Sequence, residues 1–144
     1  MAGSEVSAVE PFGILQVALQ SAGVRYAVGG SWASAAYGEA RFTNNIDILA
    51  DFNRASLERF LEALATVFYF DVAEARRAFE RGRPFNLIYM PTALKFDMFP
   101  ARAFPIGLEE LERATLLVNS GLSDAPAPFV SPEDIMLAKL CWFR

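Results

Sequence analysis

The feature that most constrains the fold of this chain is a Gly-Gly-Ser turn that follows a short apolar segment. Residues 26–28 are typical of a buried strand, which Gly29 and Gly30 end. Because glycines lack Cβ atoms, they can adopt positive φ angles and let an anion approach the backbone closely. Residues 31–37 then predict a short helix that Gly38 ends. The segment predicts a strand, a tight turn and a helix in that order.

The helix predicted after the turn would point its N-terminus toward the glycines. Free backbone N–H groups and the positive end of the helix dipole make such a terminus an anion-binding site. The Ser31 hydroxyl can donate a hydrogen bond to a phosphate oxygen, or it can simply cap the helix. Taken alone, the turn leaves a phosphate site and a structural cap as alternatives.

Two apolar segments downstream each contain one carboxylate. Asp47 lies in the predicted strand 46–50, and Asp97 lies in the predicted strand 94–99. Because successive residues of a strand point to opposite faces, each carboxylate projects from the face opposite its apolar neighbours. An acid in an apolar strand is costly unless it is paired, solvated or bound to a metal. On neighbouring strands the two acids could hold a hard cation, whereas on edge strands they would face water or an arginine.

The rest of the chain alternates helical and strand patterns. A turn at residues 90–93 is expected to join two strands into a hairpin that carries Asp97 toward the glycine turn. We find no internal repeat and no linker, so one domain is expected over residues 1–144. The expected helices cover 10–22, 55–67, 72–81, 108–113 and a segment that starts at Ser131; the expected strands cover 85–89, 94–99 and 115–118; residues 122–129 are expected to form a loop.

Composition excludes several kinds of site. The 144 residues are 53% hydrophobic, enough for one globular domain with a sizeable core. Histidine is absent, which rules out Ser-His-Asp and Cys-His nucleophiles and histidine-based zinc sites within the chain. Cys141 is the only cysteine, so no intrachain disulfide forms, in keeping with a reducing cytosol. Any metal must therefore be bound by oxygen atoms.

Charge and hydropathy favour a soluble, cytoplasmic protein. The sequence contains no run of about 18 apolar residues and no signal peptide, so no membrane association is expected. Its net charge of −4 argues against extended, nonspecific binding to nucleic acid, which requires many lysines and arginines.

Together these features resemble the nucleotidyltransferase superfamily with the DNA polymerase β-type catalytic fold, over about the whole chain. The family pattern is an apolar strand, a Gly-Ser or Gly-Gly-Ser turn, a short helix, an Arg-x-Thr-x-Asp-x-Asp strand and a third carboxylate on a later strand. Here the turn is matched by Gly29, Gly30 and Ser31, the lead-in by Arg41 and Thr43, the second carboxylate by Asp47 and the third by Asp97.

The resemblance implies both a fold and an activity. The implied fold is α+β, with a mixed β-sheet flanked by helices like the polymerase β palm. The implied activity is the Mg²⁺-dependent transfer of a nucleoside monophosphate from an NTP to a hydroxyl acceptor, which is a protein, a small molecule or an RNA end. Asp47 and Asp97 would be catalytic metal ligands, and the nucleotide would be bound by Gly29, Gly30, Ser31, Arg41 and Thr43.

The C-terminal segment 130–140 is similar to the helix start of the minimal and AbiEii-like toxin–antitoxin branches of the superfamily. That similarity implies that Lys139 reaches a phosphate group. The helix runs to Arg144 without a glycine cap, which leaves two alternatives. Either the natural chain continues, or Trp142 and Phe143 pack on a second subunit in a homodimer.

One position departs from the family pattern, because Asn45 stands where the first aspartate is expected. Two-metal chemistry needs concentrated negative charge to hold cations about 3.5–4 Å apart, and an amide oxygen is a neutral, poor Mg²⁺ ligand. Asp51 cannot substitute, since it would lie roughly 13 Å from Asp47 along the strand. We therefore expect either a weakened transferase, in which Asn45 is a neutral remnant ligand, or a catalytically silent domain. The silent domain would bind nucleotide or a partner protein in a toxin–antitoxin or regulatory pair.

Overall fold

The structure is a computed structural model that describes residues 7–29, 45–118, 121–123 and 125–142. None of the helices in these ranges is long and apolar enough to cross a membrane. Along the chain the elements are α1 (Val9–Ser21), β1 (Arg25–Gly29), β2 (Asn45–Asp51), α3 (Arg54–Leu64), β3 (Phe68–Tyr69), α4 (Val72–Arg81), β4 (Phe85–Tyr89), β5 (Leu94–Pro100), the 3-10 helix η1 (Ala101–Ala103), α5 (Gly107–Glu112), β6 (Thr115–Leu117), β7 (Ala127–Phe129) and α6 (Pro132–Trp142).

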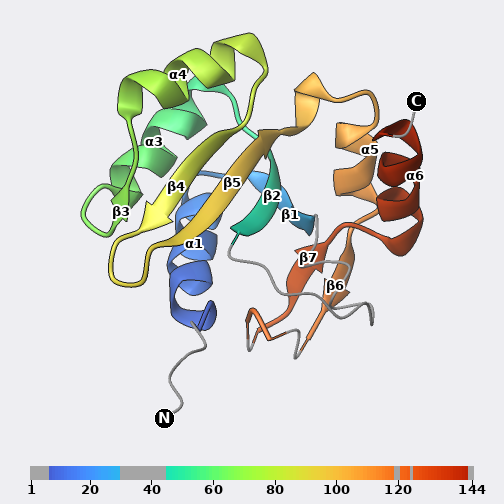
Figure 1. The fold of residues 1–144 in the computed structure, drawn as a ribbon, viewed down its shortest axis with the longest axis horizontal. Coiled ribbons are helices and arrows are strands. Elements are labelled where there is room, and N and C mark those ends of the chain that lie inside the picture. Colours follow the sequence, from blue (N-terminus) through green and yellow to red (C-terminus); the bar gives the residue numbers. More distant parts are fainter. Residues whose placement is uncertain (1–6, 30–44, 119–120, 124, 143–144) are drawn as a thin grey trace.

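The strands form one sheet in the order β3-β4-β5-β2-β1-β7-β6 (Figure 1). The pairs β2/β5 and β1/β7 are parallel, and the other neighbouring pairs are antiparallel. The fold class predicted from the sequence, α+β with a mixed sheet flanked by helices, is confirmed. The predicted hairpin is also present, because β4 and β5 pair directly across the turn that joins them.

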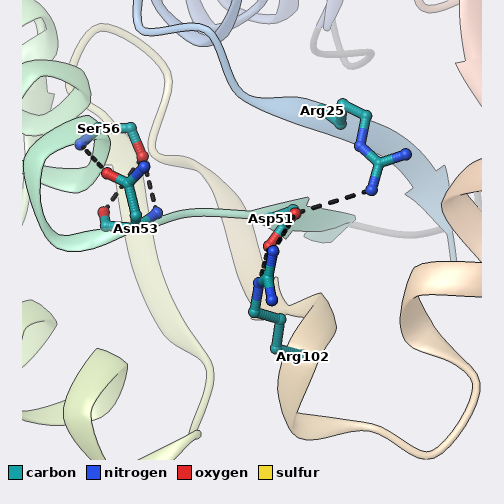
Figure 2. Close-up of polar contacts among 5 residues, drawn as sticks. All are labelled: Arg25, Asp51, Asn53, Ser56 and Arg102. Atoms are coloured by element: carbon teal, nitrogen blue, oxygen red, sulfur yellow. Dashed lines mark hydrogen bonds and ion pairs between the residues drawn. The ribbon is translucent and has the colours of Figure 1, made fainter.

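Side-chain caps explain where two of the helices begin. Asn53 caps α3, since its side chain accepts a hydrogen bond from the backbone N–H of Ser56 at 2.8 Å and the Ser56 hydroxyl accepts one in return at 2.9 Å (Figure 2). Asp71 caps α4, which ends at Gly82 in the left-handed conformation with φ of 66°. The helix expected over 72–81 is therefore confirmed, whereas the one expected over 55–67 ends at Leu64.

The main core fills the space between one face of the sheet and helices α1, α3 and α4. On β2, Ile46 and Ile48 are fully buried on this face, as the alternation of the strand predicts. They belong to a cluster with aromatic and aliphatic side chains that include Phe12 and Leu15 of α1, Phe60 of α3, Ala75 of α4 and Phe96 of β5. This packing fixes which face of β2 and β5 is left for their carboxylates.

A smaller apolar cluster lies on the opposite face of the sheet. It joins Ala27 of β1 and Leu49 of β2 to Ala101, to Leu111 of α5 and to Val130. Leu49 is on the same face as Asp47 and is nevertheless buried, with 8% of its surface exposed. One end of the acid-bearing face is therefore covered by α5, and the acids lie next to this apolar cover.

The loop expected over 122–129 is wrong in part, because its last three residues form β7. Phe129 pairs with Val28 of β1, and the backbone N–H of Val130 donates to the Val28 carbonyl at 2.8 Å. Pro128 removes one backbone donor and weakens any strand signal in the sequence. The strand forms because its partners, β1 and β6, supply pairing that local sequence does not encode.

Candidate active site

One row of residues crosses four neighbouring strands of the sheet. In register, Gly29 pairs with Asp47, Asp47 with Asp97, and Asp97 with Asn86. Residues paired in register project from the same face, so the two carboxyl groups and the Asn86 amide lie side by side, in line with Gly29 at the end of β1. The expectation that both acids project from neighbouring strands, opposite the main core, is confirmed.

The carboxyl groups of Asp47 and Asp97 are close enough to share a hydrogen bond, and both residues are half-buried. Burial, the charge of Asp97 and the hydrogen bond between the two carboxyl groups together raise the pKa of Asp47 to about 6. Two carboxylates this close resist ionising together. The pair therefore carries a proton below about pH 6 unless a cation takes its place.

Asn86 is a site residue that the sequence analysis missed. Its Nδ2 donates a hydrogen bond of 2.9 Å to Oδ1 of Asp97. The bond fixes the position of one oxygen of Asp97. A signal was present in the sequence, because a hairpin that turns over residues 90–93 pairs position 86 with position 97.

The predicted nucleotide-binding residues are only partly within the described structure. Gly29 ends β1 beside Asp47, in strand conformation and without the positive φ that a glycine permits. A Cβ added to it would meet the nearest side-chain atom, of Val130, at 3.5 Å, an ordinary contact. Gly30, Ser31, Arg41 and Thr43 lie outside the described residues, as does the helix predicted over 31–37.

Asn45 and Lys95 form the next row on the same face. Asn45 opens β2 two residues before Asp47, and it pairs in register with Lys95 of β5. Both residues are half-buried. The position where the family pattern expects an acid therefore has an amide, with a lysine on the adjacent strand. The lysine was also missed by the sequence analysis, because its position depends on the register of two strands far apart in the chain.

Asp51 at the other end of β2 has a different environment (Figure 2). Arg102 donates from Nε to its Oδ1 at 2.7 Å and from Nη2 to its Oδ2 at 3.3 Å. Arg25 on β1 adds a third contact, with Nη2 lying 3.8 Å from Oδ2. Asp51 thus connects β2 to β1 and η1 and does not take part in the row of Asp47 and Asp97.

The C-terminal helix α6 begins as predicted, with the Ser131 hydroxyl accepting a hydrogen bond from the backbone N–H of Asp134 at 3.2 Å. Asp134 is almost fully buried and accepts two hydrogen bonds from Arg113, at 2.6 and 3.1 Å. This pair attaches α6 to the end of α5. Lys139 lies on α6, and its side chain is outside the described part of the structure.

A pocket of about 210 Å³ opens at the far end of the row. Asn86 belongs to its lining, together with Tyr69, Glu74 and Ile88. Because Asn86 also bonds Asp97, the pocket adjoins the acid pair on the side opposite the Gly29 turn.

The donor set for a metal is small. Within the described residues no group of three or more His, Cys, Asp or Glu side chains is placed to hold a metal ion. The acid pair offers carboxylate oxygens from two chain positions, which suits a hard cation that keeps other ligands from water or substrate.

Known structures share this architecture. TM1012 of Thermotoga maritima, a protein to which a nucleotidyltransferase activity is attributed, superposes with a TM-score of 0.62 at 15% identity, over 100% of this chain and 91% of that one. The lincosamide antibiotic adenylyltransferase LnuA, in its lincomycin-bound form, matches with a TM-score of 0.54 at 16% identity, over 89% of this chain and 82% of that one.

A third similar structure is the antibiotic-resistance factor ANT(2'')-Ia, with a TM-score of 0.55 at 18% identity, over 91% of this chain and 69% of that one. No protein-family model and no curated protein sequence matches the chain. At these identities the likeness concerns the fold. The chain therefore has the fold of the nucleotidyltransferases, with two carboxylates paired on adjacent central strands beside the end of β1.

Proposed function

We propose that this protein transfers a nucleoside monophosphate from an NTP to a hydroxyl acceptor and releases pyrophosphate. The observation that carries the proposal is the half-buried pair of Asp47 and Asp97, in register on adjacent strands and next to Gly29. In the reaction the acceptor oxygen bonds to the α-phosphorus, the bond from that phosphorus to the pyrophosphate oxygen breaks, and the hydroxyl proton passes to solvent.

The acid pair fits a divalent cation such as Mg²⁺. Its two carboxyl groups share a hydrogen bond in a partly desolvated place, and a hard cation would neutralise the same two oxygens that otherwise need a proton. When bound, such a cation polarises the acceptor hydroxyl and neutralises phosphate charge. The hydrogen bond from Asn86 holds Asp97 in position for that ligation.

The remaining roles concern binding of the triphosphate and of the acceptor. Gly29, Gly30 and Ser31 would bind the β- and γ-phosphates, because glycines let an anion approach the backbone closely and the Ser31 hydroxyl can donate a hydrogen bond. Arg41 and Lys139 neutralise phosphate charge in the transition state. The acceptor enters from the pocket beside Asn86, which is also lined by Tyr69 and Glu74.

A second candidate is a catalytically silent domain that binds nucleotide or a partner protein, as in a toxin–antitoxin or regulatory pair. The observation that favours it is Asn45, whose amide replaces a carboxylate in the row next to the acid pair. With one negative charge fewer, metal binding and turnover are expected to be weaker than in a site with three acids.

Calorimetry and a transfer assay separate these candidates. We would titrate ATP, CTP, GTP and UTP with and without Mg²⁺ into the wild type, Asn45→Asp, Asp47→Asn and the control Glu62→Gln, whose side chain is exposed on α3. Labelled NTPs would then be offered with a panel of acceptors: protein, RNA ends, a lincosamide and an aminoglycoside. The last two are included because the neighbours LnuA and ANT(2'')-Ia are a lincosamide adenylyltransferase and an antibiotic-resistance factor.

Transfer by the wild type and by Glu62→Gln, but not by Asp47→Asn, would support the proposed reaction. Nucleotide binding by the wild type with transfer only in Asn45→Asp would support the silent domain. If no nucleotide binds either the wild type or Asn45→Asp, the transferase and the nucleotide-binding form of the silent domain are both wrong, and only a silent domain that binds a partner protein is left.

A further inference from the structure

The row that neighbours the acid pair contains a lysine beside Asn45, the position where the family pattern expects the first aspartate. Lys95 pairs in register with Asn45 and is two residues before Asp97, so its side chain leaves the same face as the acids. It is half-buried, and it makes no ion pair within the described part of the chain. A lysine in this position has no structural carboxylate partner among those residues.

The charge of this group of side chains differs from that of a site built for two metals. Asn45, Asp47, Lys95 and Asp97 together carry a net charge of −1 when both acids are ionised. Two divalent cations about 3.5–4 Å apart need more negative charge than this, and the second one would lie beside an ammonium group. Like charges repel more strongly near a partly buried site than in water, and a divalent ion is repelled twice as strongly as a monovalent one.

We propose that the site holds one divalent cation, on Asp47 and Asp97, and that the Lys95 ammonium takes the place of the second cation against the triphosphate. A lysine ammonium is a compact charge with three donors, which suits phosphate oxygens. The inference rests on the proposed transferase function and concerns how the triphosphate is held. Asn45 and Lys95 act together in it, since the amide removes the acid that would otherwise attract the second metal or neutralise the lysine.

The number of bound cations tests this inference independently of activity. We would count Mn²⁺ per chain by electron paramagnetic resonance, in the presence of an NTP whose α,β-bridging oxygen is replaced by methylene. The wild type is expected to bind one Mn²⁺ per chain. Lys95→Met is expected to bind the analogue about 10-fold or more weakly, whereas Lys95→Arg and the control Arg81→Met, at an exposed cation on α4, keep wild-type affinity.

A double variant sharpens the test. Asn45→Asp combined with Lys95→Met restores the acid and removes the ammonium, so it is expected to bind two Mn²⁺. In transfer assays Lys95→Met should lower kcat by about 100-fold with a smaller change in KM, and the double variant should recover much of that loss. Thermal melting of each variant shows whether it is folded, and the Mn²⁺ count of the wild type still tests the inference if Lys95→Met is unstable.

Two results would overturn the inference. Two Mn²⁺ bound by the wild type would show that Lys95 does not replace a cation, and unchanged analogue affinity in folded Lys95→Met would show that it does not contact the triphosphate. Either result leaves the transferase proposal intact if the wild type still binds and transfers nucleotide. Failure of both the wild type and Asn45→Asp to bind any NTP would instead remove the proposed function, and this inference with it.

Discussion

Asp47 and Asp51 lie on the same strand and project from the same face, yet the protein surrounds them in opposite ways. Two arginines contact Asp51, and one of them donates two hydrogen bonds to it. Asp47 is paired instead with a second carboxyl group, and burial together with this neighbour raises the pKa of Asp47 to about 6. Asp51 is neutralised by arginines of the same chain and so links neighbouring elements. Asp47 has no such arginine within the described part of the chain, so a proton or a bound cation must neutralise its charge.

The largest expected difference between the two positions is in activity. Asp97→Asn removes one of the two charges that would hold the cation, and transfer is expected to fall at least about 100-fold, because even outer partners of metal sites contribute 10–100-fold. Asp51→Asn leaves the acid pair intact and should keep most of the activity. Initial rates of labelled-NTP transfer measure both. Equal losses of transfer activity in the two variants would mean that Asp51 belongs to the catalytic site, and the contrast drawn between Asp47 and Asp51 would be wrong.

The next effect concerns stability, for which substitution of Asp51 is expected to be more harmful than substitution in the acid pair. Asp51→Ala removes an acceptor whose side chain is only 12% exposed and leaves two arginines without it, so the free energy of unfolding should fall by about 1–3 kcal/mol. The arginines are themselves 57% and 69% exposed and can turn to water, which keeps the loss at this level. Urea denaturation at pH 8 measures it. A loss below about 0.5 kcal/mol would show that the ion pairs contribute only as surface pairs do.

A smaller effect should appear in the pH dependence of stability. Because the pKa of Asp47 rises from 3.8 to about 6 on folding, the folded state binds more protons in between, and its stability declines as the pH rises through this range. Asp47→Asn removes the decline, so the variant should gain stability relative to the wild type at pH 8 and not at pH 4.

Denaturation in EDTA at several pH values tests this, with Asp51→Asn as the control that should lose stability at pH 8. Adding Mg²⁺ should stabilise the wild type more at pH 8 than at pH 5, since the cation competes with a proton at Asp47. A gain from Asp47→Asn that is equal at pH 4 and pH 8 would contradict the assignment of this titration to Asp47.

Much of this comparison could be predicted from the sequence. Alternation within strands 46–50 and 94–99 placed both Asp47 and Asp97 opposite their apolar neighbours, and the hairpin turn brought the second acid into the sheet. The partners of Asp51 could not be predicted in this way. Arg102 reaches it from η1 because β2 and β5 run parallel in one register, a pairing that depends on packing across the whole sheet.

The same limit explains what was missed at the candidate site. Lys95 lies beside Asn45 only through the β2/β5 register, and β7 forms only because β1 and β6 pair with it. Local signals there point elsewhere, since Pro128 argues against a strand. Periodicity predicts which face a residue occupies, whereas its neighbours across the sheet follow from strand order, which long-range packing decides.

A similar contrast, between an acid paired with an arginine and an acid near other acids, is found at the junction of α5 and α6. The smallest of the expected effects on stability concerns this junction. Asp134 is buried and bonded twice by Arg113, whereas Glu110 lies half-buried near them. Burial and the charges of Asp134 and Glu109, partly opposed by Arg113, together raise the pKa of Glu110 from 4.5 to about 7. The folded state thus gains protons between these values, and stability declines as the pH rises through them.

Glu110→Gln should therefore raise the melting temperature at pH 8 and leave it nearly unchanged at pH 4. The shift should be modest, because Glu110 is partly solvated and Arg113 already compensates some of its charge. Glu112→Gln, at an exposed position on the same helix, serves as the matched control and should show no such dependence on pH. If the two variants behave alike, the carboxylate of Glu110 is well solvated. In that case, an acid near the Arg113–Asp134 ion pair is not destabilised by the lack of a cation of its own.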